Sequence, residues 1–135
     1  MFDVARRYCD AHQIVYTGID PFESRQSESP SLSMKDAYKL LRQQGVKVKL
    51  VPGDTLAAMT MTANSLANTD LIVIDAAISH ADLEKAWRYF PRMMHKKSLI
   101  LRQNYDPQGL RFQDLSLADV QSRIDESADR AAKAA

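Results

Sequence analysis

Three aspartates stand at or just after the ends of short apolar runs. Asp20 ends "IVYTGID", Asp54 follows "VKVKLVPG" and Asp75 ends "DLIVID". Ligands bind outside the carboxyl ends of the strands in open parallel sheets, so acids at these positions are candidate binding residues. An ionised carboxylate only accepts hydrogen bonds, which suits the two hydroxyls of a ribose and the amino group of adenine.

Each aspartate taken alone also has a local structural explanation. Asp20 precedes Pro21 and can start a turn, while Asp54 stands where the N-cap of a helix is expected. Asp75 can cap the segment that leads into the next helix. For any one of them the structural explanation is the stronger, but three acids along one sheet edge favour a nucleoside site.

The elements that would position these acids alternate along the chain. Apolar and β-branched runs predict strands over 14–19, 46–51, 70–75 and 98–103, with a short strand over 110–113. Helical periodicity predicts helices over 2–12, 34–44, 56–67, 80–89 and 116–135, with Ser33 as an N-cap and Gly45 as a stop. Strands that alternate with helices predict an α/β fold with one mainly parallel sheet. The unbroken apolar run "DLIVID" predicts a strand covered on both faces.

Length and composition set broader limits. The 135 residues predict one domain, 1–135, and a net charge of +1 gives no electrostatic reason to expect nucleic acid or an anionic membrane as a partner. Cys9 is the sole cysteine, so an internal disulfide and a cysteine metal cage are excluded, and we expect Cys9 to be a small buried residue. The first residues lack the apolar core of a secretory signal, and no apolar stretch has the length of a membrane span. We therefore expect a cytoplasmic protein.

Residues 2–103 resemble the class I S-adenosylmethionine-dependent methyltransferases, a family with a Rossmann-like three-layer α/β/α sandwich. "YTGID" is similar to the family's second strand, whose final acid binds the cofactor ribose, and "VKLVPGDTLAAM" to the third strand and the Gly-Asp turn beside the adenine. "TDLIVIDAAISHADLEKAWRYFPRMMHKKSLIL" resembles the fourth strand, its helix and the fifth strand. The resemblance implies S-adenosylmethionine as cofactor, methyl transfer to a small molecule, and a cofactor site formed by Gly18, Asp20, Gly53, Asp54 and Asp75. Residues 104–135 would add a loop and an amphipathic helix to this core.

The chain departs from the family in three places. The first strand and its Gly-rich turn would precede Phe2, Ala77 replaces a second acid that holds a metal in some relatives, and only "LRFQDL" represents the final hairpin. The resemblance therefore implies no metal. In the family the missing strand separates strands 14–19 and 70–75, so these must pair directly or another chain must fill the gap, because open central edges are unstable. We accordingly expect a homodimer or a rearranged sheet; a chain start upstream of Met1 is the third explanation.

The remaining candidates have less support. His80 could act as a base near the expected pocket, but it equally suits the first turn of a helix. Trp87, Tyr89 and Phe90 are expected in the core or a dimer interface. The segment "SRQSESPS" could close over a substrate, although an ordinary loop explains it. The leading function is a methyltransferase of minimal size; the alternative is a non-catalytic module acting in dimerisation or protein interaction, with helix 116–135 used for association.

Overall fold

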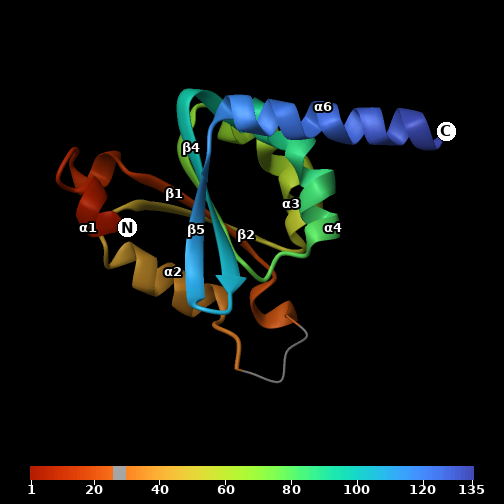
Figure 1. The fold of residues 1–135 in the computed structure, drawn as a ribbon. Coiled ribbons are helices and arrows are strands. Elements are labelled where there is room, and N and C mark those ends of the chain that lie inside the picture. Colours follow the sequence, from red (N-terminus) through yellow and green to blue (C-terminus); the bar gives the residue numbers. More distant parts are fainter. Residues whose placement is uncertain (26–29) are drawn as a thin grey trace. The chain divides into compact units, whose positions relative to one another are not determined.

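The contacts within the chain form two compact units, and both contain helices and parallel strands. The structure, a computed structural model, describes residues 1–25 and 30–135. The N-terminal unit is Met1–Ala58 and the C-terminal unit is Met59–Ala135, with the boundary inside helix α3 (Thr55–Thr62) (Figure 1). The predicted α/β class is therefore confirmed.

The N-terminal unit is built on a parallel pair of strands. Its elements are α1 (Phe2–Ala5), η1 (Ala11–Gln13), β1 (Val15–Asp20), η2 (Phe22–Ser24), α2 (Met34–Arg42), β2 (Lys47–Pro52) and the start of α3. The register runs from Val15 opposite Lys47 to Asp20 opposite Pro52, so the two strands end together. The predicted helix 2–12 is shorter than expected, and Cys9 is exposed rather than buried because the chain leaves the helix before reaching it. Part of the proposed lid "SRQSESPS" lies outside the described residues.

Three helices begin with the same N-cap. The hydroxyl oxygens of Ser33, Ser79 and Ser116 each accept a hydrogen bond from the backbone N–H of an aspartate three residues later. This contact satisfies an N–H that has no partner inside the helix, and the aspartate places negative charge at the positive end of the helix dipole. The predicted N-cap at Ser33 is therefore confirmed.

The C-terminal unit is a three-stranded sheet with helices against it. After the end of α3, its elements are η3 (Ala63–Leu66), β3 (Thr69–Ile74), α4 (His80–Ala86), η4 (Trp87–Tyr89), α5 (Phe90–Met93), β4 (Met94–Asp106), β5 (Gly109–Leu115) and α6 (Leu117–Ala134). Strand β4 lies in the middle, parallel to β3 and antiparallel to β5. The predicted helix 80–89 ends before Pro91 as expected, but it is divided into α4, which ends at Ala86, and η4, which ends at Tyr89. Pro91 lies in the first turn of the next helix, α5, where its missing N–H costs nothing.

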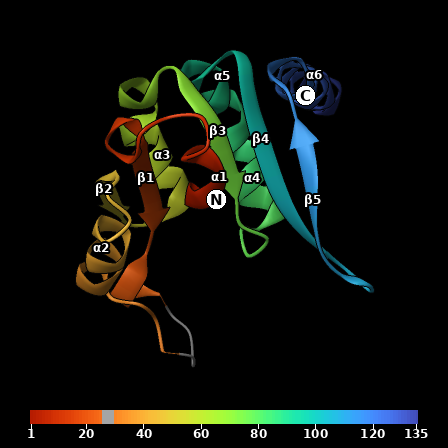
Figure 2. The same cartoon turned by 90° about the vertical axis from the view of Figure 1, so that its left-hand side faces the viewer.

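The two faces of this sheet are buried unequally. Ile100 has no exposed surface, and its neighbours on the same face, Leu115 and, diagonally, Ile74, are also buried. Figure 2 shows β3 and β4 in front of α4, with β5 beside β4 and below α6 in the view. On the other face Leu71 is 39% and Val73 46% exposed. The prediction that strand 70–75 is covered on both faces is therefore wrong.

The strands form two sheets rather than the single sheet expected from the sequence. Among the described residues, β1 pairs with β2 alone and β3 with β4 alone. Direct pairing of the strands that would flank the missing one is therefore not the arrangement in this structure, and β1 and β3 each keep one unpaired edge in the part of the chain described. The short strand expected over 110–113 is present and longer, as β5.

The one-sided core of the C-terminal unit predicts the effect of truncating Ile100. Ile100→Ala should lower the free energy of unfolding by about 2–5 kcal/mol, because it removes a fully buried side chain and leaves a cavity. Urea unfolding followed by the fluorescence of Trp87, the sole tryptophan and itself 1% exposed, measures this effect. Met61→Ala is the control, since Met61 is 85% exposed, and should change stability by less than about 0.5 kcal/mol. Equal losses in the two variants would contradict the described core.

Candidate functional site

Asp20 ends β1 and holds the turn that follows. Its Oδ1 accepts a hydrogen bond of 2.6 Å from the backbone N–H of Phe22, and its Oδ2 forms an ion pair with Arg25. Phe22 is buried with a φ of 47°, a left-handed conformation that a bulky residue rarely adopts. The carboxylate thus stabilises an unfavourable backbone conformation, so it has a structural task whether or not a ligand binds.

Gly18 gives space to an aromatic ring. Residues 16, 18 and 20 point to one side of β1, and a Cβ at Gly18 would lie 3.1 Å from Tyr16 Cε1 and 3.1 Å from Leu50 Cδ2. The Tyr16 ring packs edge-on against Phe2, with centroids 5.6 Å apart. Burial and, to a lesser degree, the charge of Asp20 raise the pKa of the Tyr16 hydroxyl. The packing of Tyr16 is therefore sufficient reason for a glycine at position 18.

Gly53 and Asp54 lie beside Asp20 at the carboxyl edge of the N-terminal unit. The Gly53 N–H donates to the carbonyl oxygen of Asp20 at 3.1 Å, and Gly53 has a φ of 131° that favours glycine. No atom lies within 4 Å of where its Cβ would be, so the backbone is open there. Asp54 Oδ1 accepts from the N–H groups of Leu56 and Ala57, both at 3.1 Å, and so caps α3. The structure thus brings Asp20, Gly53 and Asp54 together.

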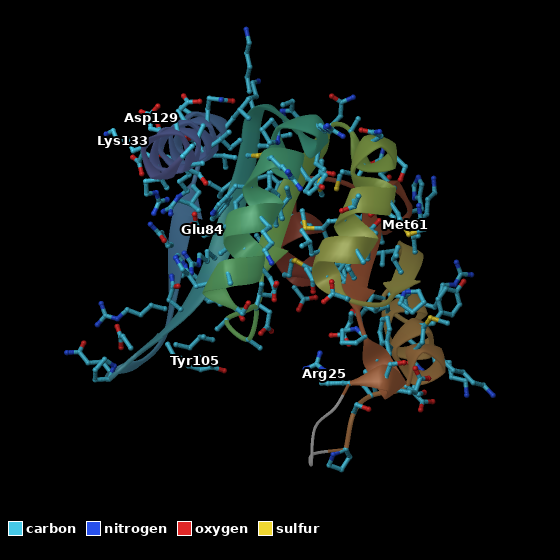
Figure 3. All side chains as sticks on the ribbon, turned by 90° about the vertical axis from the view of Figure 1, so that its right-hand side faces the viewer. Arg25, Met61, Glu84, Tyr105, Asp129 and Lys133 are labelled. Carbon is cyan, nitrogen blue, oxygen red and sulfur yellow. The ribbon has the colours of Figure 1, made fainter. Side chains whose placement is uncertain are left out.

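Asp75 and His80 belong to the C-terminal unit. Asp75 follows β3, and its Oδ1 accepts from the Ala77 N–H at 2.7 Å, which closes a local turn. His80 is the first residue of α4, its side chain is 74% exposed, and its Nε2 lies 3.9 Å from Glu84 Oε1. Glu84, labelled in Figure 3, also pairs with Arg130 of α6 at 3.3 Å. His80 is therefore accounted for by the first turn of a helix.

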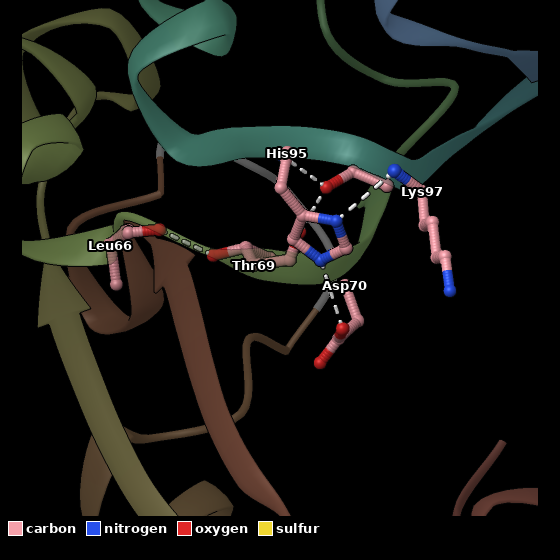
Figure 4. A network of polar contacts seen from close by, with 6 residues as sticks. Leu66, Thr69, Asp70, His95 and Lys97 are labelled. Atoms are coloured by element: carbon pink, nitrogen blue, oxygen red, sulfur yellow. Dashed lines mark hydrogen bonds and ion pairs between the residues drawn. The ribbon is translucent and has the colours of Figure 1, made fainter.

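A polar network that the sequence analysis did not identify joins the starts of β3 and β4 (Figure 4). The buried Ser98 hydroxyl donates to the Thr69 carbonyl and accepts from the His95 N–H, both at 2.7 Å. The His95 ring accepts from the Lys97 N–H at Nδ1, so its Nε2 carries the proton that binds Asp70 at 3.0 Å. These residues lie at the amino end of the strands, opposite the edge where ligands bind in parallel sheets, so we assign the network to structure.

The surroundings of Tyr89 are a second feature that the sequence analysis did not identify. Hydrogen bonds from the side chains of Thr60 and Arg88 lower the pKa of its hydroxyl, with the charges of Arg88 and Arg92 adding to the effect. The two guanidinium carbons lie 5.1 and 5.7 Å from the ring centroid. In the sequence, this environment is indicated only by Arg88 and Arg92, which stand one residue before and three residues after Tyr89.

Within residues 1–25 and 30–135, no three His, Cys, Asp or Glu side chains gather closely enough to hold a metal ion. In the same ranges, no helix combines the length and the apolar character needed to cross a bilayer.

Comparisons with known proteins give no match: neither a family model, nor a curated protein, nor a solved structure is similar to this chain. A proposal of function therefore has two sources, the geometry described above and the resemblance of the sequence.

The network at Ser98 predicts a loss of stability on removal of one hydroxyl. Ser98→Ala leaves the Thr69 carbonyl and the His95 N–H without this buried partner, which should lower the free energy of unfolding by about 1–3 kcal/mol. Ser65→Ala is the matched control, because Ser65 bonds a carbonyl on the exposed surface. Chemical unfolding of both variants measures the difference, and an unchanged Ser98→Ala midpoint would refute the assignment.

The environment of Tyr16 predicts a pH dependence. The pKa of the Tyr16 hydroxyl is raised in the folded state, so the unfolded chain loses the phenolic proton at a lower pH. The contribution of Tyr16 to the free energy of unfolding is therefore fully present below about pH 10 and is lost as the pH rises through the folded-state pKa. Asp20→Asn should lower this pKa without restoring the ordinary value, since burial is the larger cause. Ultraviolet titration of phenolate absorbance measures the change. Tyr16→Phe should remove the part of the absorbance rise that comes from this raised pKa, whereas Tyr89→Phe, which removes a hydroxyl of lowered pKa, should leave that part in place.

Proposed function

We propose that the N-terminal unit binds the adenosine part of S-adenosylmethionine at the carboxyl edge of β1 and β2, within a Rossmann-like methyltransferase fold of minimal size. The observation that carries the proposal is the adjacency of Asp20 and the Gly53–Asp54 turn, joined by the hydrogen bond from Gly53 to Asp20. The acid that ends β1 and the acid that follows β2 provide acceptors at one edge for both ribose hydroxyls and the adenine amino group.

The local contacts of Asp20 leave room for this role. A carboxylate has roughly four acceptor sites, and the contacts with Phe22 and Arg25 occupy one on each oxygen. The Arg25 and Asp20 side chains are 47% and 36% exposed, so their ion pair is worth at most about 1 kcal/mol. A hydrogen bond from a ligand hydroxyl to a charged acceptor contributes about 1.5–3 kcal/mol. Displacing Arg25 would therefore cost less than the ligand gains.

Methyl transfer to a small nucleophile is the reaction that the resemblance implies. The substrate would have to lie in line with the methyl group on the cofactor sulfur, and holding it there supplies most of the rate acceleration. Neither His80, which pairs with Glu84, nor Asp75, which closes a turn, has a contact that assigns it a catalytic role. The proposed chemistry accordingly depends on positioning by the fold.

A different observation favours a non-catalytic module as the second candidate. Asp20, Asp54 and Asp75 each already accept a hydrogen bond from nearby backbone, so folding alone explains all three acids. A protein of this kind would bind no cofactor, and the titration below separates the two candidates.

Calorimetric titration with S-adenosylmethionine and S-adenosylhomocysteine tests the proposal. We expect binding by the unaltered chain and a loss of roughly 10- to 100-fold in affinity for Asp20→Asn, which keeps an acceptor for Phe22 but removes the charge. Asp70→Asn is the matched control, because Asp70 is an exposed acid in the other unit. The absence of heat and of any thermal shift at millimolar ligand, or an equal loss in both variants, would rule out the cofactor site.

A further inference from the structure

The face of the C-terminal sheet away from α4 and α5 carries a group of exposed apolar side chains. We call it the open face, and it includes Leu71, Val73, Leu99, Tyr105, Leu110 and Phe112. The register places them together: Leu71 is opposite Leu99, and Tyr105 is opposite Leu110, so each pair points to the same side. Alternation along β4 and β5 puts Leu99, Tyr105 and Phe112 on that side as well.

The exposure of these residues is large for a single surface. Leu71, Val73 and Leu99 are 37–46% exposed, and Leu110, Phe112 and Tyr105 are 48–77% exposed. Since large side chains present on the order of 150–250 Å² each, the open face leaves roughly 600 Å² of apolar surface uncovered. The largest apolar patch on a typical monomer measures about 300–600 Å² and is often an interaction site.

We propose that the open face is the surface through which two copies of this chain associate. Two such faces would bury about 1,200 Å² in total, the lower limit for specific, stable interfaces. A two-fold axis brings the same patch of each copy together, so the patch must be complementary to itself. A sheet face of mainly uncharged side chains meets this condition, as it does when two sheets pack about 10 Å apart in a sandwich.

The charges around the open face also favour a second copy. None of its six side chains carries a charge at neutral pH, and two polar residues share the face: Gln103, opposite Phe112, and Asp114, opposite Leu101. A strongly charged partner would therefore meet a single charged group, Asp114, whereas a second copy presents the same mainly uncharged surface. Tyr105, on the part of β4 that extends past α4 in Figure 3, would contribute the largest exposed aromatic ring.

Sedimentation velocity of the full chain over about two orders of magnitude in concentration tests the proposal. We expect the unaltered chain to reach the mass of a dimer, and Phe112→Lys to raise the dissociation constant at least about tenfold. Val73→Thr, which keeps the side-chain shape, is a milder second variant should the lysine disturb folding. Met61→Lys is the matched control, because Met61 is apolar and 85% exposed but lies on α3.

Three results would overturn the proposal. The unaltered chain could stay monomeric at the highest concentration, or its dimer could survive Phe112→Lys and Val73→Thr with unchanged affinity. A loss of stability in both face variants, measured by Trp87 fluorescence, with no change in mass would show that another part of the same chain covers the face. Equal dissociation by Met61→Lys would remove the specificity of the surface.

Discussion

The C-terminal unit depends on one row of apolar side chains that crosses its three strands. Ile72, Ile100 and Leu115 are neighbours in register, and Ile100, in the middle, has no exposed surface. Helices α5 and α6 pack against β4 on this side, and Val120 of α6 is fully buried there. Because side chains alternate along a strand, the register that buries this row also turns Leu71, Val73 and Leu99 to the opposite side. The core and the open face are thus two results of the same pairing.

Helix starts and strand positions could be predicted because their causes lie within a few residues. Ser33 and Asp36 form a cap that is visible in the sequence, and the abrupt end of β1 follows from Asp20 and Pro21. The end of the first helix was not predicted correctly. Cys9 was expected to be buried, but a short helix followed by a turn leaves it exposed, and helical periodicity alone does not reveal where a first helix stops.

The candidate site was harder to interpret because one chemical property serves two purposes. A carboxylate that accepts hydrogen bonds from a ribose equally accepts them from the N–H groups of a turn or a helix start. Asp54 and Asp75 illustrate the second use, and Asp20 has a turn contact beside acceptor sites that remain. Gly18 is similar: the resemblance implied a cofactor-binding role, whereas in the structure the ring of Tyr16 lies 3.1 Å from where a Cβ at position 18 would be. Only the identity of the partner atoms distinguishes these cases.

The apolar run "DLIVID" shows what residue types leave undecided. Its composition indicates that both faces of β3 are apolar, but it carries no information on what lies against each face. By area, roughly 600 Å² of uncovered apolar surface corresponds to about 15 kcal/mol of unrealised transfer free energy. That amount is comparable to the whole stability of a typical domain. Association of two copies loses an estimated 4–15 kcal/mol of translational and rotational freedom, which burial of two such faces is large enough to offset. The exposure of Leu71, Val73 and Phe112 is thus the observation on which the proposed association of two copies depends.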